Sequence, residues 1–301
     1  MAAIAFADPL TRLDVLSPTG WGDYELIDSG GGRKLERFGP YILDRPESNA
    51  LWTTRQHVSN WERADARFTV PSGGGMGEWE FARRIPERWA MRYEPLDLTC
   101  WVGCRPFRHT GLFPEQAAHW DWLAATARQR EIKPKVLVLF GYTALATLAL
   151  ARVGAQVTHV DASRPMTSWA RANADASGLA DRSVRWLIED ALAFLRREAR
   201  RGAQYDGIVM DPPAFGRGPS GETWRFHQSL PELMSACMAV MAEKPRLFLI
   251  NAYAVPASAT MLANMVKDVV PATGTLTAGE LALDGGGRTL ATGIYARWHA
   301  D

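Results

Sequence analysis

The residues best suited to chemistry follow a short apolar segment near the middle of the C-terminal half of the chain. They are Asp211, Pro212, Pro213 and Phe215. A carboxylate and the carbonyl oxygens of a proline pair can accept hydrogen bonds from an amine or a ring nitrogen, and two prolines fix the loop while removing two N–H donors. An aromatic ring two residues further on can stack on a planar base. We therefore expect this loop to bind a nitrogen-containing aromatic ring, with a rigid turn as the alternative.

Two earlier segments could hold a nucleoside. Gly141 ends an apolar run and permits a close backbone approach, unless it only forms a tight turn. Asp161 follows 20 residues later and can accept both hydroxyl groups of a ribose. Further on, Asp190 can accept a hydrogen bond from the adenine amine, and Ala191 can donate its backbone N–H to a ring nitrogen. Asp190 is also suited to cap the helix that follows, and the two roles can coexist.

The elements that must position these residues alternate between strand and helix patterns. Apolar segments that predict strands cover residues 135–140, 155–161, 184–190, 205–211 and 246–253, and a helical pattern follows each of them. Two further strands around a Gly-rich turn are predicted over residues 280–298. This alternation predicts an α/β fold, a doubly wound and mostly parallel sheet with a C-terminal antiparallel hairpin. Ligands bind at the carboxyl ends of the strands in such sheets.

The preceding residues predict a separate, small mixed α/β domain. A hairpin is expected over residues 24–39, around Gly30–Gly32, and strands follow in residues 78–103. Between them, the spacing of Trp52, Val58 and Trp61 is compatible with a helix over residues 50–68. We place the division at residue 105, so that the domains are residues 1–105 and 106–301.

Composition narrows the class of protein. The chain has 301 residues, of which 47% are hydrophobic and 22% charged, as in an ordinary globular protein. Its 34 basic and 33 acidic residues give a formal net charge of +1. This balance excludes a highly basic protein that coats nucleic acid, but it allows an enzyme that holds RNA through one local patch.

Cysteine usage predicts a reducing, cytoplasmic location. Cys100, Cys104 and Cys237 cannot form a disulfide framework, and the Cys-x3-Cys pair lacks the further ligands of a zinc site, so no metal is expected. The first ten residues lack the basic region of a signal peptide. The longest uncharged stretch, residues 136–151, is shorter than the ~20 residues that span a bilayer, so no membrane association is expected.

The segments VLVLFGYTALATLALARVGA, VD, ED and DPPAFGRG together resemble the Rossmann-like S-adenosylmethionine-dependent methyltransferases. Within them, the chain is similar to the branch of the bacterial 23S rRNA large-subunit cytosine-C5 and guanine-N7 methyltransferases. The segment TGLFPEQ, residues 110–116, is similar to a TGxFxDQR-like segment of that branch. The resemblance covers residues 105–301, and the mixed α/β unit before them is similar to the family's middle domain.

The resemblance implies S-adenosylmethionine as cofactor and S-adenosylhomocysteine as product. The implied cofactor residues are Phe113 and Gln116 as a cover, Gly141, Tyr142 and Thr143 beneath the methionine end, Asp161 and Ala162 at the ribose, Asp190 and Ala191 at the adenine, and Asp211 and Pro212 around the transferable methyl group. Asp211, Pro212 and Phe215 are the implied catalytic residues. The implied substrate-binding residues are Pro213, Phe215, Asn251 and Arg217.

Two departures from the family pattern bear on the reaction. Ala144 stands where a glycine is usual, which puts the path of the loop in question. The cytosine-C5 members need a cysteine nucleophile after the fifth strand, where this chain has residues 249–253, LINAY. Cys237 lies in an apolar helix pattern and is expected in the core. We therefore expect transfer to a nitrogen rather than covalent C5 methylation.

The expected acceptor is RNA, and among RNAs a ribosomal one, bound by a monomer or a homodimer. Asn251 could bind the base or cap a strand. A phosphate-binding rim, if it is not merely a solvated surface, would consist of Arg105, Arg108, Arg217, Arg225 and His227. A protein or small-molecule acceptor, and a non-catalytic RNA-binding module with a decayed site, are the alternatives. A nicotinamide-dependent dehydrogenase is less favoured, because the G-x-G-x-x-G pattern is absent.

Overall fold

A computed structural model describes residues 14–53, 58–71, 77–105, 109–128, 133–218 and 221–301. The chain divides into two compact units. Unit 1 comprises residues 1–16, 119–281 and 293–301, and unit 2 comprises residues 17–118 and 282–292.

This division differs from the predicted boundary at residue 105, because unit 2 extends to residue 118 and because two terminal segments lie in the other unit than predicted. Residues 14–16 form a strand of unit 1, and the turn end of the C-terminal hairpin, residues 282–292, belongs to unit 2. Within unit 2, the backbone of Gly285 lies against Leu26, where a side chain at position 285 would not fit. Pairings between segments so far apart in the chain leave no local periodicity from which to predict them.

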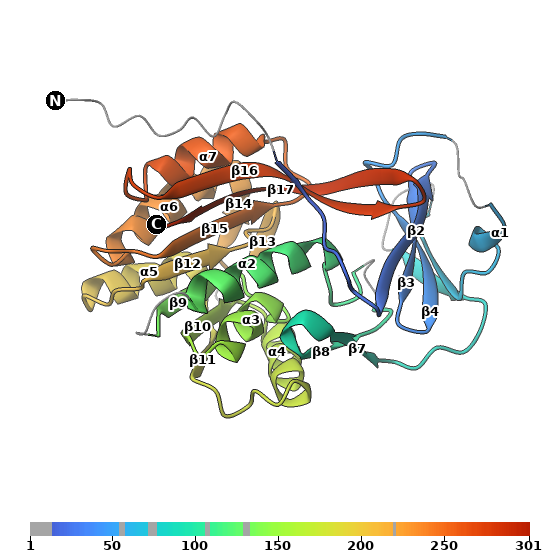
Figure 1. Ribbon diagram of the computed structural model, residues 1–301, viewed down its shortest axis with the longest axis horizontal. Helices are drawn as coiled ribbons and strands as arrows, with labels where there is room; N and C mark the ends of the chain where they lie inside the picture. Colours follow the sequence, from blue (N-terminus) through green and yellow to red (C-terminus); the bar gives the residue numbers. More distant parts are fainter. Residues whose placement is uncertain (1–13, 54–57, 72–76, 106–108, 129–132, 219–220) are drawn as a thin grey trace. The chain divides into compact units, whose positions relative to one another are not determined.

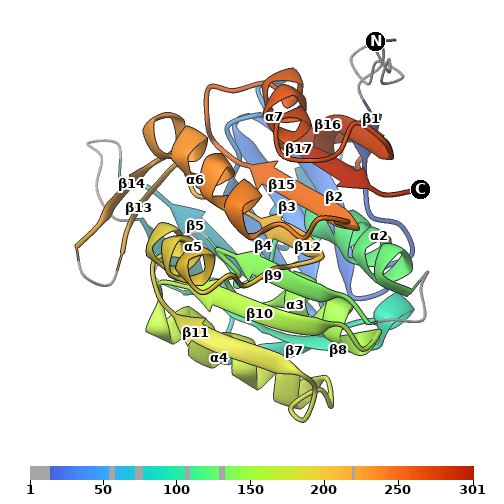
Figure 2. The ribbon, with the colours of Figure 1, turned by 90° about the vertical axis from the view of Figure 1, so that its left-hand side faces the viewer.

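Unit 1 is built on an eight-stranded sheet. In sheet order the strands are β1 (Asp14–Leu16), β16 (Thr275–Gly285), β17 (Arg288–His299), β15 (Leu247–Ala252), β12 (Gly207–Met210), β9 (Lys135–Leu139), β10 (Gln156–Asp161) and β11 (Val184–Ile188). The five strands from β15 to β11 are parallel and lie side by side, and β17 is antiparallel to β15 (Figure 2). The predicted α/β fold class is confirmed, with β1 as an additional edge strand parallel to β16.

Helices connect the parallel strands. The helices are α2 (Ala117–Arg128), α3 (Leu145–Arg152), α4 (Arg164–Ala176), α5 (Ala191–Arg200), α6 (Phe226–Val240) and α7 (Ala259–Lys267). The hydroxyl groups of Ser163 and Ser258 and the carboxylate of Asp190 cap α4, α7 and α5, which fixes where these helices begin. None of the described helices is both long and apolar enough to cross a membrane.

The two faces of the sheet carry different helices, as a doubly wound fold requires. Leu139, Val160, Met210 and Ile250 face the core that contains the apolar residues of α5, α6 and α7. Successive strand residues point to opposite faces, so His159 faces the other side, where its ring contacts Thr147 of α3. Ligand-binding residues after these strands are therefore held between two packed layers.

Unit 2 contains a five-stranded sheet and a separate hairpin. The sheet order is β2 (Tyr24–Gly30), β3 (Arg33–Phe38), β4 (Tyr41–Pro46), β5 (Ala66–Thr69) and β6 (Glu78–Phe81), and the hairpin pairs β7 (Trp89–Tyr93) with β8 (Leu98–Val102) (Figure 1). Short helical turns are α1 (Val58–Trp61), η2 (Glu94–Leu96) and η3 (Pro114–Gln116). The predicted hairpin over residues 24–39 and the strands within residues 78–103 are confirmed.

The helix predicted over residues 50–68 is wrong. Within this range the structure has the single turn α1 and the strand β5. The indole of Trp52 donates to the Ser29 carbonyl at 2.6 Å, and that of Trp61 donates to the Asp28 carboxylate at 2.9 Å. Both tryptophans thus bind the end of β2, and a continuous helix would lose these long-range hydrogen bonds.

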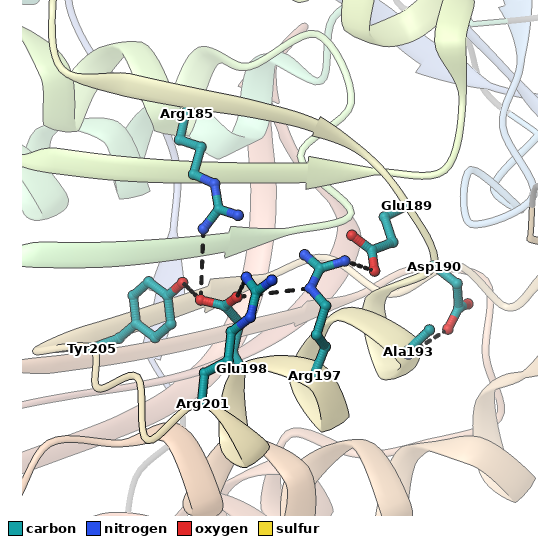
Figure 3. A network of polar contacts seen from close by, with 8 residues as sticks. All are labelled: Arg185, Glu189, Asp190, Ala193, Arg197, Glu198, Arg201 and Tyr205. Atoms are coloured by element: carbon teal, nitrogen blue, oxygen red, sulfur yellow. Dashed lines mark hydrogen bonds and ion pairs between the residues drawn. The ribbon is translucent and has the colours of Figure 1, made fainter.

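A buried carboxylate joins three elements of unit 1. Glu198 of α5 is 3% exposed and accepts a hydrogen bond from the Tyr205 hydroxyl at 3.0 Å. Arg201 lies 3.3 Å from the same carboxylate and Arg185 of β11 lies 3.6 Å from it (Figure 3). The network ties α5 to β11 and to the segment that enters β12.

We expect Glu198→Ala to lower the free energy of unfolding by about 2 kcal/mol, because the Tyr205 hydroxyl loses its buried acceptor. Glu232→Ala is the matched control. Glu232 of α6 forms an ion pair with Arg196, and the two side chains are 55% and 56% exposed. That exposed pair should contribute about 0.5 kcal/mol or less. Urea denaturation of both variants measures the difference, and equal losses would contradict the assigned role of Glu198.

Candidate functional site

The turn after β9, residues 140–144, has an unusual backbone. Phe140, Tyr142 and Ala144 have φ angles of 54°, 49° and 76°, although none of them is a glycine. Left-handed backbone costs about 1–2 kcal/mol for each such residue. Ala144 thus keeps a conformation that a glycine adopts without strain. We call residues 140–144 the β9 turn, and its neighbours must hold it in place.

His159 lies directly beneath the β9 turn. A Cβ atom at Gly141 would overlap the His159 ring, so the close approach that Gly141 permits is to this histidine. His159 is fully buried, and its Nδ1 lies 2.9 Å from the Thr147 hydroxyl. Burial lowers the pKa of His159 to about 3, so the ring is neutral near pH 7. It supports the turn by packing and carries no charge.

Hydrogen bonds hold the rest of the β9 turn. The Asp161 carboxylate accepts from the backbone N–H groups of Tyr142 and Ser163, both at 2.8 Å, and Asn173 donates to the Thr143 carbonyl at 2.9 Å. Burial raises the pKa of Asp161, while the two N–H donors lower it. A carboxylate has about four acceptor positions, so Asp161 can still accept two hydroxyl groups. It is therefore fixed in a form that fits the diol of a ribose.

The end of β11 offers an apolar surface beside a carboxylate. Ile188 is 38% exposed, and the half-buried Asp190 caps α5 by accepting from the Ala193 N–H at 2.9 Å. Glu189 is engaged in an ion pair with Arg197 (Figure 3). The capping role that the sequence allowed for Asp190 is confirmed. An aliphatic side chain next to a hydrogen-bond acceptor fits the face and the amino edge of an adenine.

Residues that follow the Asp-Pro-Pro turn in the sequence hold its backbone by hydrogen bonds. The Pro213 carbonyl accepts from the Trp224 indole at 2.5 Å, and the Ala214 carbonyl accepts from the Phe226 N–H at 3.1 Å. One acceptor position of the Pro213 carbonyl is thus taken by Trp224, and its role toward a ligand stays a prediction. Asp211, which is half-buried, and the carbonyl of the buried Pro212 stay as the candidate acceptors.

A short hairpin of β13 (Phe215–Arg217) and β14 (Thr223–Arg225) follows this turn. Phe215 is 55% exposed, and the Arg225 guanidinium lies 5.9 Å from its ring centroid. Arg217 is exposed on the same hairpin. An exposed aromatic ring with two cations on the same hairpin suits a planar base attached to a phosphate chain.

The remaining predicted residues lie outside the three loops described above. Asn251 lies near the carboxyl end of β15 and is 2% exposed, so its role toward a base stays a prediction. Phe113 and Gln116 belong to unit 2, and their covering role stays a prediction. Arg105 also belongs to unit 2 and pairs with Glu87 at 2.8 Å. Arg108 lies outside the described residues.

Sequence reasoning missed three residues that position the site: His159, Asn173 and Trp224. His159 interrupts an apolar strand at a position that the period of two predicts to be buried. Asn173 and Trp224 show no comparable signal, because their partners are backbone carbonyls 30 and 11 residues away.

The arrangement fits a nucleoside ligand with a reactive group near Asp211. Asp161 has acceptor positions that suit a ribose, Ile188 and Asp190 suit an adenine, and the β9 turn follows the strand beside β10 in the parallel sheet. Within the described residues, no three His, Cys, Asp or Glu side chains gather to hold a metal ion.

Comparison with known proteins gives a consistent result. A solved S-adenosylmethionine-dependent methyltransferase from Agrobacterium tumefaciens is 38% identical, with a TM-score of 0.89 over 96% of this chain and 94% of that chain. A solved methyltransferase in complex with S-adenosylhomocysteine is 15% identical, with a TM-score of 0.70 over 92% of this chain and 75% of that one, and shares the fold. No family model matches the chain.

Among curated proteins, the ribosomal RNA large subunit methyltransferase K/L of Syntrophotalea carbinolica is 35% identical over 140 residues. These residues are 46% of this chain and 19% of that relative. The chain thus spans about a fifth of the length of this curated relative.

The buried histidine gives the site a defined pH dependence. The unfolded chain binds a proton to His159 near its ordinary pKa of about 6.5, whereas the folded protein does not until about pH 3. Unfolding therefore takes up a proton as the pH falls, and stability falls with it. From pH 6.5 to pH 5 the loss should be about 1.5 kcal/mol for His159. Between pH 6.5 and pH 5, the free energy of unfolding of His159→Gln should fall by about 1.5 kcal/mol less than that of the parent, as measured by thermal or urea unfolding. An equal fall in both proteins would contradict a neutral, buried ring.

Proposed function

This chain belongs to the S-adenosylmethionine-dependent methyltransferases. We propose that it methylates a nitrogen atom of a nucleobase in RNA. The proposed substrate is a ribosomal RNA. The observation that carries the proposal is the exposed Phe215, directly after the Asp-Pro-Pro turn, with Arg225 over its ring and the exposed Arg217 two residues further along the same strand. A stacking ring supports a base, and the two cations support the phosphates on either side of it.

The donor site consists of residues at the ends of three neighbouring strands. S-adenosylmethionine, when bound, supplies a methyl group on a sulfonium that is already activated for transfer. Asp161 would hold the ribose, Ala162 would adjoin it, and Ile188 with Asp190 and the Ala191 N–H would hold the adenine. Tyr142 and Thr143 of the β9 turn would lie beneath the methionine end.

The acceptor residues work by alignment. The Asp211 carboxylate and the Pro212 carbonyl would accept hydrogen bonds from the base nitrogen, and Phe215 would fix the plane of the base. Because the methyl group is activated, the nitrogen needs orientation and exclusion of water more than it needs a strong base. Pro213 would contribute its ring to the wall of the site, and Trp224 holds its carbonyl.

The cysteines support nitrogen as the methylated atom. Cys100 and Cys237 are buried and Cys104 is half-buried. Burial raises the pKa of Cys100 and Cys104 to about 12 and raises that of Cys237 further, so all three are protonated thiols at neutral pH. None is suited to attack C6 of a pyrimidine, which covalent C5 methylation requires.

The curated relative supports an RNA acceptor, because it is a ribosomal RNA large subunit methyltransferase. Such an acceptor agrees with the near-neutral net charge, which predicts modest affinity through a local patch. It also agrees with the cytoplasmic location that the cysteine content predicts.

Asp161→Asn tests the donor site. The amide keeps the shape of the carboxylate but loses the charge, and its NH2 group would face the N–H of Tyr142 or of Ser163. We expect the affinity for S-adenosylhomocysteine to fall about 30-fold, since charge-assisted hydrogen bonds contribute about 2 kcal/mol. Isothermal titration calorimetry measures it. Asp175→Asn on the exposed side of α4 is the control, and equal affinities of the two variants would exclude Asp161 from the site.

Phe215→Ala tests the acceptor site. Loss of one base–aromatic contact should reduce methyl transfer into RNA at low RNA concentration about 10- to 100-fold. Incorporation of tritium from labelled donor into RNA measures this. Met238→Ala, which truncates another exposed apolar side chain of unit 1, should retain the parental rate. Label that stays in RNase-resistant material would contradict an RNA acceptor and favour a protein.

A further inference from the structure

We propose that Trp224 is a positioning residue that connects the donor-binding turn to the acceptor-binding turn. It lies in β14, opposite Gly216 of β13, and is 8% exposed between the exposed Thr223 and Arg225. Directly paired residues share one face of a hairpin, so Trp224 and Gly216 form the inner face and Phe215 and Arg225 the outer one. The inner face carries no predicted ligand contact.

Two contacts link Trp224 to both turns. Its indole N–H donates to the Pro213 carbonyl at 2.5 Å, which fixes the turn that ends in Phe215. Its ring lies 5.1 Å from the ring of Phe140, at an interplanar angle of 56°. Phe140 is the first residue of the strained β9 turn, with a φ angle of 54°. One side chain therefore contacts the backbone of one turn and the first side chain of the other.

This arrangement sets the distance between the two substrates, an inference that rests on the proposed function. The β9 turn would hold the methionine end of the donor, and the outer face of the hairpin would hold the base. Transfer of a methyl group needs the two reacting atoms within about 3–3.5 Å and in line, and a misplacement of about 1 Å can cost 100-fold. A group that fixes one turn against the other thus acts on the transfer step and not on the affinity for the donor alone.

A residue that only fills the core would not need an indole. Phenylalanine would also pack against Phe140, but it could not donate to the Pro213 carbonyl. Pro213 lacks a backbone N–H, so its carbonyl is the backbone group of this residue that a hydrogen bond can hold, and the Trp224 N–H donates to it. The hydrogen bond, more than the packing, is the feature that we assign to positioning.

Trp224→Phe separates the two contacts, because it keeps the ring and removes the donor. Trp298→Phe is a matched control. Trp298 of β17 is 1% exposed, and its indole also donates to a backbone carbonyl, that of Thr273, at 3.0 Å. Trp298 pairs with Phe248 near the amino end of β15, whereas the candidate site lies at the carboxyl ends of the strands. Both substitutions remove the same chemical group from the same core.

We expect both variants to melt at similarly lowered temperatures, while only Trp224→Phe lowers kcat for RNA methylation, by about tenfold. Its affinity for S-adenosylhomocysteine, measured by calorimetry, should stay within about twofold of the parent. Trp224→Leu, which also loses the contact with Phe140, should weaken that affinity as well. A parental kcat in Trp224→Phe, or an equal loss in Trp298→Phe, would overturn the positioning role.

Hydrogen exchange separates this inference from the proposed acceptor. Without the indole donor, backbone amides at residues 214–217 and 223–226 should exchange faster in Trp224→Phe than in the parent and in Trp298→Phe. Unchanged exchange there would overturn the inference, whatever the acceptor is. Absence of RNA methylation by the parent protein, together with the expected exchange difference, would overturn the RNA acceptor and leave the positioning role intact.

Discussion

The contact between Gly141 and His159 is the constraint on which the candidate site depends. The β9 turn takes a path that three non-glycine residues adopt only at a cost, and position 141 is the point where the sheet beneath leaves no room for a side chain. Burial keeps His159 neutral, so the turn rests on an uncharged ring. Asp161 accepts a hydrogen bond from the Tyr142 N–H, and Asn173 donates one to the Thr143 carbonyl, so both hold the backbone of the turn.

Strain of this kind is useful where a ligand must be met by a preformed surface. The free energy that holds the β9 turn comes from the packed strands and helices around it, and the turn does not need to order itself when the donor binds. The same logic applies to the Asp-Pro-Pro turn, whose backbone is fixed by Trp224 and by the start of α6. Methyl transfer from an activated donor depends on alignment, so two rigid turns at one sheet edge suit this reaction.

The sequence predicted the parts of the fold that have local periodicity. Each of the five parallel strands and the acidic residues that follow them could be predicted, because buried strands and helix caps are encoded by neighbouring residues. The helix over residues 50–68 failed since Trp52 and Trp61 bind β2 through long-range hydrogen bonds. Asn251 follows the correct strand, yet strand position alone does not reveal that a side chain is covered. The assignment of residues 282–292 to unit 2 likewise depends on contacts with residues far earlier in the chain.

The central claim is that the β9 turn and the ends of β10 and β11 form one nucleoside-binding site. A crystal structure of the protein grown with S-adenosylhomocysteine tests this most directly. We expect both ribose hydroxyl groups within hydrogen-bond distance of Asp161, the adenine against Ile188 with its amine near Asp190, and an unchanged backbone at residues 140–144. A ligand bound elsewhere, or a β9 turn that rearranges to admit it, would contradict the claim.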